Sequence, residues 1–486
     1  MSKYETVIGL EVHAQLKTNS KMFCGCPNRF GDKPNTNICP VCTGQPGTLP
    51  VINKKAIELA IKTALATDCT VSKKSVFARK HYFYPDLPKD FQISQFELPL
   101  AEHGSLEIEV NGQKKTIGIT RIHLEEDAGK LVHKGAARIM GSDYSLADYN
   151  RAATPLMEIV SEPDIRSPEE AKAYMEKLAE LLEYIGVCDA KMEEGSLRCD
   201  ANISIRPIGQ KAFGTKTEVK NMNSFKAVQK ALQAEEIRHR EVLEEGGKIV
   251  QETRFYDDIT ETTSGMRSKE QSHDYRYFPE PDLVPLEPSQ EWIDEIEKTV
   301  GELPSDRKGR FITEHQLSAE WASFLIANML ADFFEQALKL YNNPSSIANW
   351  LIVEIPAVYS ESEKKIPLND YLGEANFTPA KLGELLKLIE DDTLNRTIAK
   401  TVIKEMLQTG KTIQDVIKEK GLTQISNESE LEKMVQEVIA NNPSQVEQFK
   451  SGKEQVMMFL VGQVMKATKG RAKPDKVQEL FRKALA

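Results

Sequence analysis

The sequence predicts an α+β fold in which a mostly antiparallel sheet is followed by two all-helical domains. Stretches of alternating polar and apolar residues recur through residues 1–293, and the side chains of a strand point to opposite faces with a period of two. From about Trp292 onward the apolar residues recur at helical spacing instead. We therefore expect domains at 1–293, 294–400 and 401–486, in keeping with a length of 486 residues.

The composition is that of a globular protein with a sizeable core, with 40% hydrophobic and 28% charged residues. The longest apolar run, residues 456–461, is too short to span a bilayer, so no membrane partner is expected. The N-terminal residues begin directly with a strand-like pattern and show no secretory signal. At a net charge of −10, any nucleic-acid partner must be bound by local basic patches.

Residues 191–206, KMEEGSLRCDANISIR, form the most informative stretch. From Leu197 onward, apolar residues occupy one side of the predicted strand. The other side carries Arg198, Asp200, Asn202, Ser204 and Arg206. A strand face in contact with water shows the same alternation. The particular mixture of charges and amides would also suit a surface that binds phosphates and a metal ion, and the stretch alone leaves both interpretations open.

A second strand-like stretch near the N-terminus, TVIGLEVH, places Glu11 and His13 on one face. They would lie about 6–7 Å apart along the strand, close enough to ligate one ion. Mg²⁺ prefers oxygen ligands, whereas an imidazole equally suits a transition metal. An exposed Glu/His pair without a metal would give the same pattern.

Two further stretches offer carboxylates on strands. In residues 117–127, IGITRIHLEED, the side chains of Arg121, His123 and Glu125 share one face. In PLMEIV, residues 155–160, Glu158 interrupts an apolar run, where a carboxylate is costly unless it is paired or bound to a metal. Together with Glu11, these stretches favour a metal site, with Glu126 as an alternative to its neighbour in the chain.

The cysteines predict a second metal site. Four of the seven lie in two close pairs bounded by proline and glycine, namely Cys24, Cys26, Cys39 and Cys42. This spacing is typical of a structural zinc site with four thiolates, although reduced free thiols would fit as well. Either interpretation points to a reducing cytoplasm.

The middle of the chain adds helices and binding candidates. Ser167-Pro168 begins a predicted helix that ends at Gly186, and another spans about residues 225–245. Between them, TKTEVK places Glu218 and Lys220 on one strand face. Residues 79–86, RKHYFYPD, would either stack against a base or pack as a loop. The sequence contains neither GxxxxGK[ST] nor GxGxxG, which excludes a P-loop and a dinucleotide-type Rossmann site.

The C-terminal third shows short amphipathic segments at 430–440, 454–467 and 475–485. Leu460, Val461, Val464 and Met465 are expected to be core residues. A basic run follows them, consisting of Lys466, Lys469, Arg471 and Lys473. Such a run is either a solvated loop or a contact with phosphates of a nucleic acid.

The chain resembles the B subunits of the aspartyl/glutamyl-tRNA amidotransferases. The resemblance extends over the whole chain and rests on several long motifs in one order. They are ETVIGLEVH (5–13), QISQ (92–95), LEEDAG (124–129), PLMEIVSEPD (155–164), MEEGSLRCDANISI (192–205), KNMNSF (220–225), DYRYFPEPD (274–282) and FLVGQVMKA (459–467).

The resemblance implies an ATP-dependent ligase that phosphorylates and then amidates the side-chain carboxylate of Glu on tRNA(Gln) or Asp on tRNA(Asn). The ammonia would come from an amidase-type A subunit, held to this chain by a small C subunit. It further implies a cradle domain similar to glutamine synthetase that binds ATP, Mg²⁺ and the acceptor end of the tRNA. A helical domain and a tRNA-binding tail domain would follow.

On this basis each candidate residue receives an expected role. Glu11, His13, Glu125 and Glu158 would form the Mg²⁺ cluster, with Glu126 as a further candidate. Arg198, Asp200, Asn202, Glu218 and Lys220 would face the nucleotide, and Lys466, Lys469, Arg471 and Lys473 would meet tRNA phosphates. Two other functions compete: a small-molecule ligase or kinase with the same cradle, and a non-catalytic tRNA-binding subunit, against which the carboxylate cluster argues.

Overall fold

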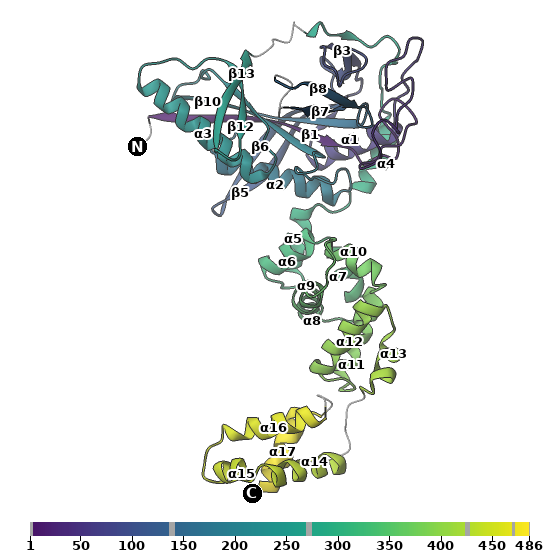
Figure 1. Ribbon diagram of the computed structural model, residues 1–486, viewed down its shortest axis with the longest axis vertical. Coiled ribbons are helices and arrows are strands. Elements are labelled where there is room, and N and C mark those ends of the chain that lie inside the picture. Colours follow the sequence, from purple (N-terminus) through teal and green to yellow (C-terminus); the bar gives the residue numbers. More distant parts are fainter. Residues whose placement is uncertain (1–2, 136–140, 269–274, 423–427, 469–471, 486) are drawn as a thin grey trace. The chain divides into compact units, whose positions relative to one another are not determined.

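The computed structural model describes residues 3–135, 141–268, 275–422, 428–468 and 472–485. The chain divides into two compact units, Met1–Pro304 and Ser305–Ala486. The first unit combines a large sheet with covering helices, and the second is built from helices (Figure 1). The expected α+β layout is thereby confirmed.

A nine-stranded mixed sheet forms the centre of the first unit. In spatial order its strands are β13 (Thr262–Ser268), β12 (Glu252–Asp257), β11 (Thr217–Lys220), β10 (Leu197–Pro207), β1 (Tyr4–Gln15), β9 (Pro155–Ser161), β6 (Gln113–Glu126), β5 (Ala101–Val110) and β2 (Thr70–Val71). β11 and β12 run parallel, and the other neighbouring strands of this described sheet are antiparallel. The sheet is therefore mostly antiparallel.

Helices cover one face of this sheet. They are α1 (Lys54–Ala66), α2 (Pro168–Tyr184) and α3 (Phe225–Glu244), and α4 (Gln290–Val300) packs against α1. α2 and α3 lie side by side beneath the strands (Figure 1). α2 begins where the sequence predicts, because the Ser167 hydroxyl accepts the backbone N–H of Glu170 and Pro168 needs no N–H partner at the first helical position.

The alternation of β10 decides which face the helices cover. The side chains of Leu197, Ala201 and Ile203 are fully buried in the core beneath the sheet. The intervening side chains of Arg198 and Asp200 point to the opposite face and are half-buried. The helices thus shield the apolar face, and the polar face is left to form a site.

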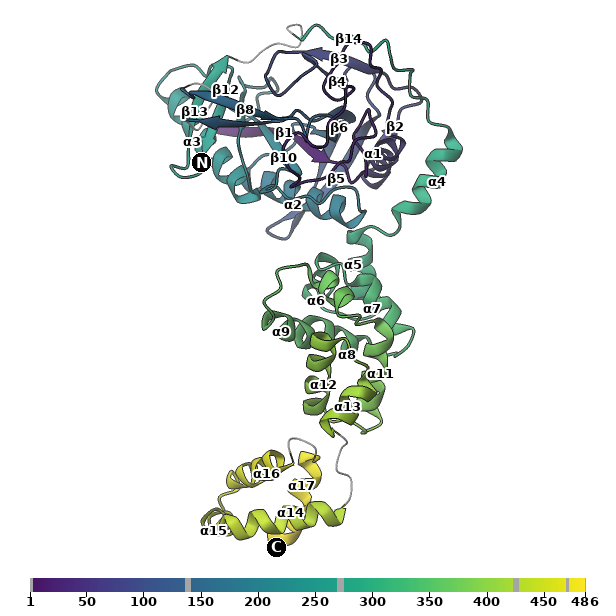
Figure 2. The same cartoon turned by 45° about the vertical axis from the view of Figure 1, so that its right-hand side comes forward.

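Two small sheets complete the first unit. One contains β14 (Phe278–Pro279), β3 (Phe77–His81) and β4 (Phe91–Gln95), which lie together in Figure 2, and the other pairs β7 (Lys130–Lys134) with β8 (Tyr144–Asp148). The loop of residues 16–53, which contains the cysteines, connects β1 to α1. β4 packs against β6, so the small sheet joins the large one near the end of that strand.

The second unit is a succession of short helices. They are α5 (Pro304–Thr313), α6 (Ala319–Ala327), α7 (Ala331–Leu338), α8 (Pro344–Asn349), the π-helical turn η2 (Trp350–Glu354), α9 (Ile355–Ser360), α10 (Leu368–Glu374), α11 (Pro379–Glu390), α12 (Arg396–Thr409), α13 (Ile413–Lys420), α14 (Glu428–Asn441), α15 (Pro443–Lys450), α16 (Val456–Ala467) and α17 (Pro474–Leu485). Pro356 lies at the start of α9, just after η2, and its missing N–H interrupts regular α-helical bonding there.

The last four helices share a core of their own. Leu460, Val461 and Val464 are buried in it and Met465 packs against it, as the sequence predicts. The three expected amphipathic segments correspond to α14, α16 and α17, whereas α15 was not predicted. Within the described ranges, none of the helices combines the length and the apolar character needed to cross a bilayer.

A buried carboxylate in α3 holds the edge of the large sheet. Glu235 is fully buried, accepts a hydrogen bond from Thr217 of β11 at 2.9 Å and forms an ion pair with Arg254 of β12 at 3.0 Å. Burial alone would raise the pKa of Glu235, but hydrogen bonds from His239 and Arg238 outweigh it and hold the pKa well below its usual range. One helix residue therefore anchors two strands.

Replacing this carboxylate is expected to loosen the sheet edge. Glu235→Gln removes the buried charge that Arg238 and Arg254 share and should lower the free energy of local opening by about 3 kcal/mol. Because the pKa of Glu235 is depressed, this stabilisation is present above the ordinary carboxyl pKa and is lost as the pH falls below it. Amide hydrogen exchange of α3 and β11 measures it. The exposed Glu241→Gln on the same helix should change protection by less than about 0.5 kcal/mol, and equal effects of the two variants would contradict the account.

Candidate functional site

Four strands bring a row of polar side chains together on the open face of the sheet. The strand registers place Arg198 of β10 opposite His13 of β1, His13 opposite Glu158 of β9, and Glu158 opposite His123 of β6. Directly opposed residues on neighbouring strands have their Cβ atoms about 4.5–5.5 Å apart. Residues far apart in the sequence therefore become a continuous polar row.

Two imidazoles flank the central carboxylate of this row. Glu158 Oε2 lies 3.3 Å from His13 Nε2 and 3.3 Å from His123 Nε2. His123 Nε2 also lies 3.2 Å from Glu125 Oε1, two residues further along β6. The strand register shifts between Ile119 and Arg121, which reverses the faces to which odd-numbered residues of β6 point. His123 and Glu125 therefore face this site, whereas Ile117 and Ile119 face the core.

The groups of this row shift each other's pKa values. Burial disfavours both imidazolium forms, yet the nearby carboxylates outweigh it, raising the pKa of His13 and raising that of His123 to about 9. Burial and the charge of Glu158 oppose ionisation of Glu125, but His123 and the ammonium of Lys80 lower its pKa to about 2. Glu158, buried between the two imidazoles, has a pKa well below its usual range. Both carboxylates are anionic at neutral pH.

Three of these residues meet the requirements of a metal site. A nitrogen of His13 and oxygens of Glu125 and Glu158 all lie within 4.8 Å of one another. Two buried carboxylates this close repel each other unless cations neutralise them. The donor set fits a divalent cation, and of the predicted ligands the structure brings these three together.

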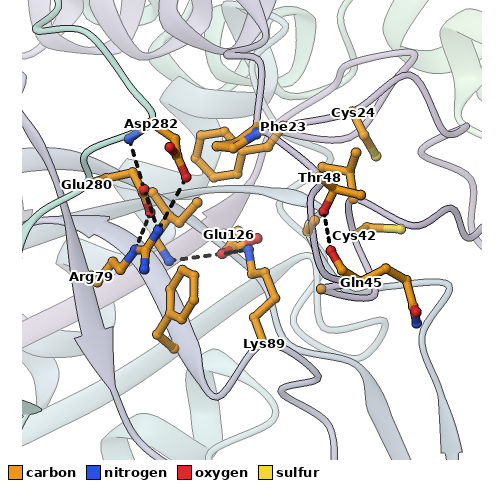
Figure 3. Close-up of a pocket in the computed structure, with 16 residues that line it drawn as sticks. Phe23, Cys24, Cys42, Gln45, Thr48, Arg79, Lys89, Glu126, Glu280 and Asp282 are labelled. Carbon is orange, nitrogen blue, oxygen red and sulfur yellow. Dashed lines mark hydrogen bonds and ion pairs between the residues drawn. The ribbon is translucent and has the colours of Figure 1, made fainter.

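Glu11 and Glu126 take different places. Glu11 lines the same cavity as the cluster and accepts a 2.9 Å hydrogen bond from the Asn202 amide across the strand pair. Glu126 points to the other side of β6, because adjacent residues of a strand face opposite ways. There it pairs with Lys89 in a separate cavity below the cysteine loop (Figure 3). The structure does not bring it into the cluster.

The residues expected to face a nucleotide divide between two cavities. Asp200, Glu218 and Lys220 line a cavity of about 360 Å³ together with the metal cluster. Lys220 forms ion pairs with Asp200 and Glu218 there, and Thr253 donates to Glu218 at 2.8 Å. Asn202 instead lines a neighbouring cavity of about 260 Å³.

Arg198 has another partner. Its guanidinium lies 2.9 Å from the carboxylate of Asp127, which is 4% exposed. Burial opposes ionisation of this carboxylate, but Arg198 and Arg151 lower the pKa of Asp127. Arg198 therefore borders the row of polar residues and secures the end of β6.

Several residues that line the main cavity received no role from the sequence. They include Lys80, Gln95, Arg121, His123, Thr253, Tyr275 and Tyr277. Burial disfavours the Lys80 ammonium, yet the carboxylate of Glu125 outweighs it and raises the pKa of this lysine. The alternation rule could have found His123, since it shares a predicted face with Glu125. Lys80 and the tyrosines lie in stretches noted only as basic and aromatic.

Within residues 79–86, Lys80 and Arg79 lie in different surroundings. Lys80 lies 5.0 Å from the ring centroid of Tyr275 at the cavity, and Phe96 stacks on Tyr277 at 4.2 Å between centroids. Arg79 instead forms a 2.7 Å ion pair with Glu280 and packs on the other side. Successive residues of β3 thus face the cavity and the packed side of the strand.

The cysteine loop forms a compact four-sulfur cluster. One Sγ atom each from Cys24, Cys26, Cys39 and Cys42 lies within 4.8 Å of the others. Hydrogen bonding from Cys24 lowers the pKa of Cys42 to about 4 against the opposing effect of burial, helped by the Cys39 N–H and the Lys21 ammonium. A pre-formed set of four sulfurs of this kind is compatible with a structural zinc ion.

The basic run near the C-terminus is described only in part. Lys466 is exposed in the last turn of α16. Lys473 forms a 2.5 Å ion pair with Asp392. Lys469 and Arg471 lie outside the described residues.

Comparison with known proteins identifies the family. A family model described as the GatB/GatE catalytic domain matches residues 6–294, and one described as the GatB domain matches residues 332–485. The B subunit of the aspartyl/glutamyl-tRNA(Asn/Gln) amidotransferase of Carboxydothermus hydrogenoformans is 55% identical, with all of both chains covered. The B subunits from Brevibacillus brevis and Thermodesulfovibrio yellowstonii are each 54% identical, covering 99% or more of both chains. The chain therefore belongs to the family of B subunits of the aspartyl/glutamyl-tRNA(Asn/Gln) amidotransferases.

Proposed function

We propose that this chain activates the side-chain carboxylate of Glu on tRNA(Gln), of Asp on tRNA(Asn), or of both, with ATP and then amidates it with ammonia. The observation that carries the proposal is the His13, Glu125 and Glu158 cluster in a cavity that also presents cationic side chains. A site for phosphoryl transfer needs both kinds of group.

The chemistry proceeds in two displacements. A carboxylate is a poor electrophile, so one of its oxygens first attacks the γ-phosphorus of ATP, forming a C–O–P linkage and releasing ADP. Ammonia then attacks the acyl carbon, the C–O bond breaks, phosphate departs and the amide remains. The protein's main tasks are to position the reactants and to neutralise charge.

Charged side chains of the cavity divide this work. His13, Glu125 and Glu158 would hold Mg²⁺, which when bound supplies charge neutralisation for the phosphates. Lys80 and Lys220 present ammonium groups to the same space. The buried Arg121 Nε has no hydrogen-bond partner among the described residues and lines this cavity, which favours an anionic occupant.

The neighbouring cavity suits the base of a nucleotide. Its walls include Val7, Gly9, Val160 and the exposed ring of Phe213, while Glu11 and Asn202 lie where the two cavities adjoin. A base could stack on the aromatic ring and leave its phosphates towards the cationic side chains. We infer a cradle similar in fold to glutamine synthetase, spanning residues 1–293, in place of a P-loop.

Zinc and partner subunits complete the proposal. Cys24, Cys26, Cys39 and Cys42 would hold a structural zinc that takes no part in bond making. An amidase-type A subunit would supply ammonia from glutamine, and a small C subunit would hold the two larger chains together in the cytoplasm. Residues 294–400 would form a helical domain and residues 401–486 a tail that contacts tRNA.

Amidation should depend on the central carboxylate. Glu158→Gln keeps the shape of the side chain but removes the charge between His13 and His123, so ATP-dependent amidation of Glu-tRNA should fall about 100-fold or more. The assembled complex would be assayed with ammonium chloride as nitrogen donor, which bypasses the glutaminase. Glu193→Gln, in an exposed turn, is the control. Equal rates for both variants would show that the cluster takes no part.

Zinc content should follow the four-sulfur cluster. The purified chain should contain about one zinc ion, and Cys39→Ser should lose most of it because one of four thiolate ligands is removed. Cys69→Ser, which changes a buried cysteine outside the cluster, should retain the metal. Elemental analysis after dialysis decides, and zinc retention by Cys39→Ser at the wild-type level would refute the site.

Lys466 should contribute an electrostatic contact with tRNA. Lys466→Ala is expected to weaken tRNA binding and to reduce the slope of log K against log salt concentration by about one, as for the loss of one phosphate contact. Lys298→Ala, an exposed lysine of α4, is the control. Filter binding at several salt concentrations measures both, and an unchanged slope for Lys466→Ala would assign this lysine to solvent.

A further inference from the structure

The loop segment that contains the last two cysteines of the cluster packs closely against Lys89, which is not part of the cluster. We name residues 39–44 the knuckle. At its end Gly44 has a φ of 68°, and a Cβ atom there would lie 2.7 Å from Cγ and 3.1 Å from Cα of Lys89. Real Cβ atoms essentially never come so close to another heavy atom. The lysine stem therefore packs so closely on Gly44 that any side chain at this position would have to displace it.

The ammonium of this lysine continues the contact. Lys89 forms an ion pair with Oε1 of Glu126, and these side chains are 12% and 2% exposed. The same oxygen accepts the backbone N–H of Ile93 in β4 at 2.9 Å. Figure 3 shows Lys89 and Glu126 pointing at each other, with Cys24 and Cys42 in the wall of the same cavity. Glu126 therefore links the knuckle, through Lys89, to β4.

β4 in turn holds the metal-cluster residue Glu125. The Gln92 amide donates to the backbone oxygen of Glu126 at 2.7 Å and to Glu125 Oε2 at 3.2 Å. The Ser94 hydroxyl donates to Glu125 Oε1 at 2.6 Å. Both oxygens of Glu125 are therefore oriented by β4.

Side chains fix the register between these two strands. β4 belongs to the three-stranded sheet and β6 to the nine-stranded one, so no backbone ladder joins them among the described residues. Their connections include the bonds of Glu125 and Glu126 and one from the Leu124 N–H to Gln95 Oε1 at 3.0 Å. A displacement of Glu126 would accordingly shift β4 and change the orientation of the Glu125 carboxylate.

We propose that the knuckle positions Glu125 for divalent-metal binding through Gly44, Lys89 and Glu126. Lys89 and Glu126 are positioning residues, since neither belongs to the group of His13, Glu125 and Glu158 and both act through Glu125. The proposal rests on the proposed function, in which His13, Glu125 and Glu158 hold the metal. The cysteine loop then has a function beyond stabilising its own fold, because it helps to orient the carboxylate of Glu125 on β6.

Manganese binding to the full-length chain provides a readout independent of turnover. Free Mn²⁺ would be measured by electron paramagnetic resonance during titration of the wild type, and Glu125→Gln would show which binding belongs to the cluster. Gly44→Ala pushes on the lysine stem, and Lys89→Met removes the charge but leaves the cysteines untouched. Gly47→Ala is the matched control, because Gly47 also has a positive φ, 84°, in the same loop but nothing within 4 Å of its Cβ position.

We expect Gly44→Ala and Lys89→Met each to weaken the Glu125-dependent Mn²⁺ affinity about ten-fold, the scale on which residues supporting a metal ligand act. Gly47→Ala should bind as the wild type does, although it bears the same backbone strain. Zinc content, measured alongside, should remain at the wild-type level in Lys89→Met.

The outcomes distinguish the metal-binding function of the cluster from the positioning role of the knuckle. If Glu125→Gln binds Mn²⁺ as well as the wild type, the proposed function of the cluster fails. If Glu125→Gln loses binding but Lys89→Met retains the wild-type affinity, the cluster stands and the positioning role is overturned, whatever Gly44→Ala does. Equal affinities of Gly44→Ala and Gly47→Ala would overturn it as well.

Discussion

The carboxylate of Glu158 is buried on β9, next to the central strand of a nine-stranded sheet, and its charge must be compensated there. His13 and His123, one on each neighbouring strand, provide hydrogen-bonding partners at 3.3 Å. Both imidazoles come from strands that pair with β9 directly, so the charge compensation depends on this strand order. Glu125 then adds a second carboxylate, and the two supply oxygen ligands of the kind that a divalent cation prefers.

The alternation of each strand makes such a site compatible with a stable core. Helices α2 and α3 bury the apolar side of β10 and its neighbours, so the opposite side is free to carry charges without weakening the core. The small sheet of β3, β4 and β14 then brings Lys80 over the cavity and Gln92 and Ser94 against Glu125. The cavity thus lies between the polar face of the large sheet and the small sheet.

Local patterns in the sequence predicted the residues that the large sheet contributes to the site, but not those that the small sheet contributes. A period of two was enough to place Glu11, His13, Glu125 and Glu158 on strand faces, and the same period assigns Glu126 to the other side. Which strands neighbour each other depends on long-range pairing, so the role of His123 between two carboxylates was not predicted. Lys80 reaches Glu125 through packing between two sheets, and Lys473 meets Asp392 across helices; neither contact leaves a periodic signal.

The most direct test of phosphoryl transfer to the substrate carboxylate follows an oxygen atom. Glu-tRNA labelled with ¹⁸O in both side-chain carboxyl oxygens would be amidated by the assembled complex with ATP and ammonium chloride, and the released phosphate would be analysed by mass spectrometry. When ammonia attacks the acyl phosphate, the C–O bond breaks and the bridging oxygen from the substrate leaves with the phosphate. Each released phosphate should therefore contain one ¹⁸O atom. Amidation accompanied by unlabelled phosphate would contradict activation of the carboxylate by ATP.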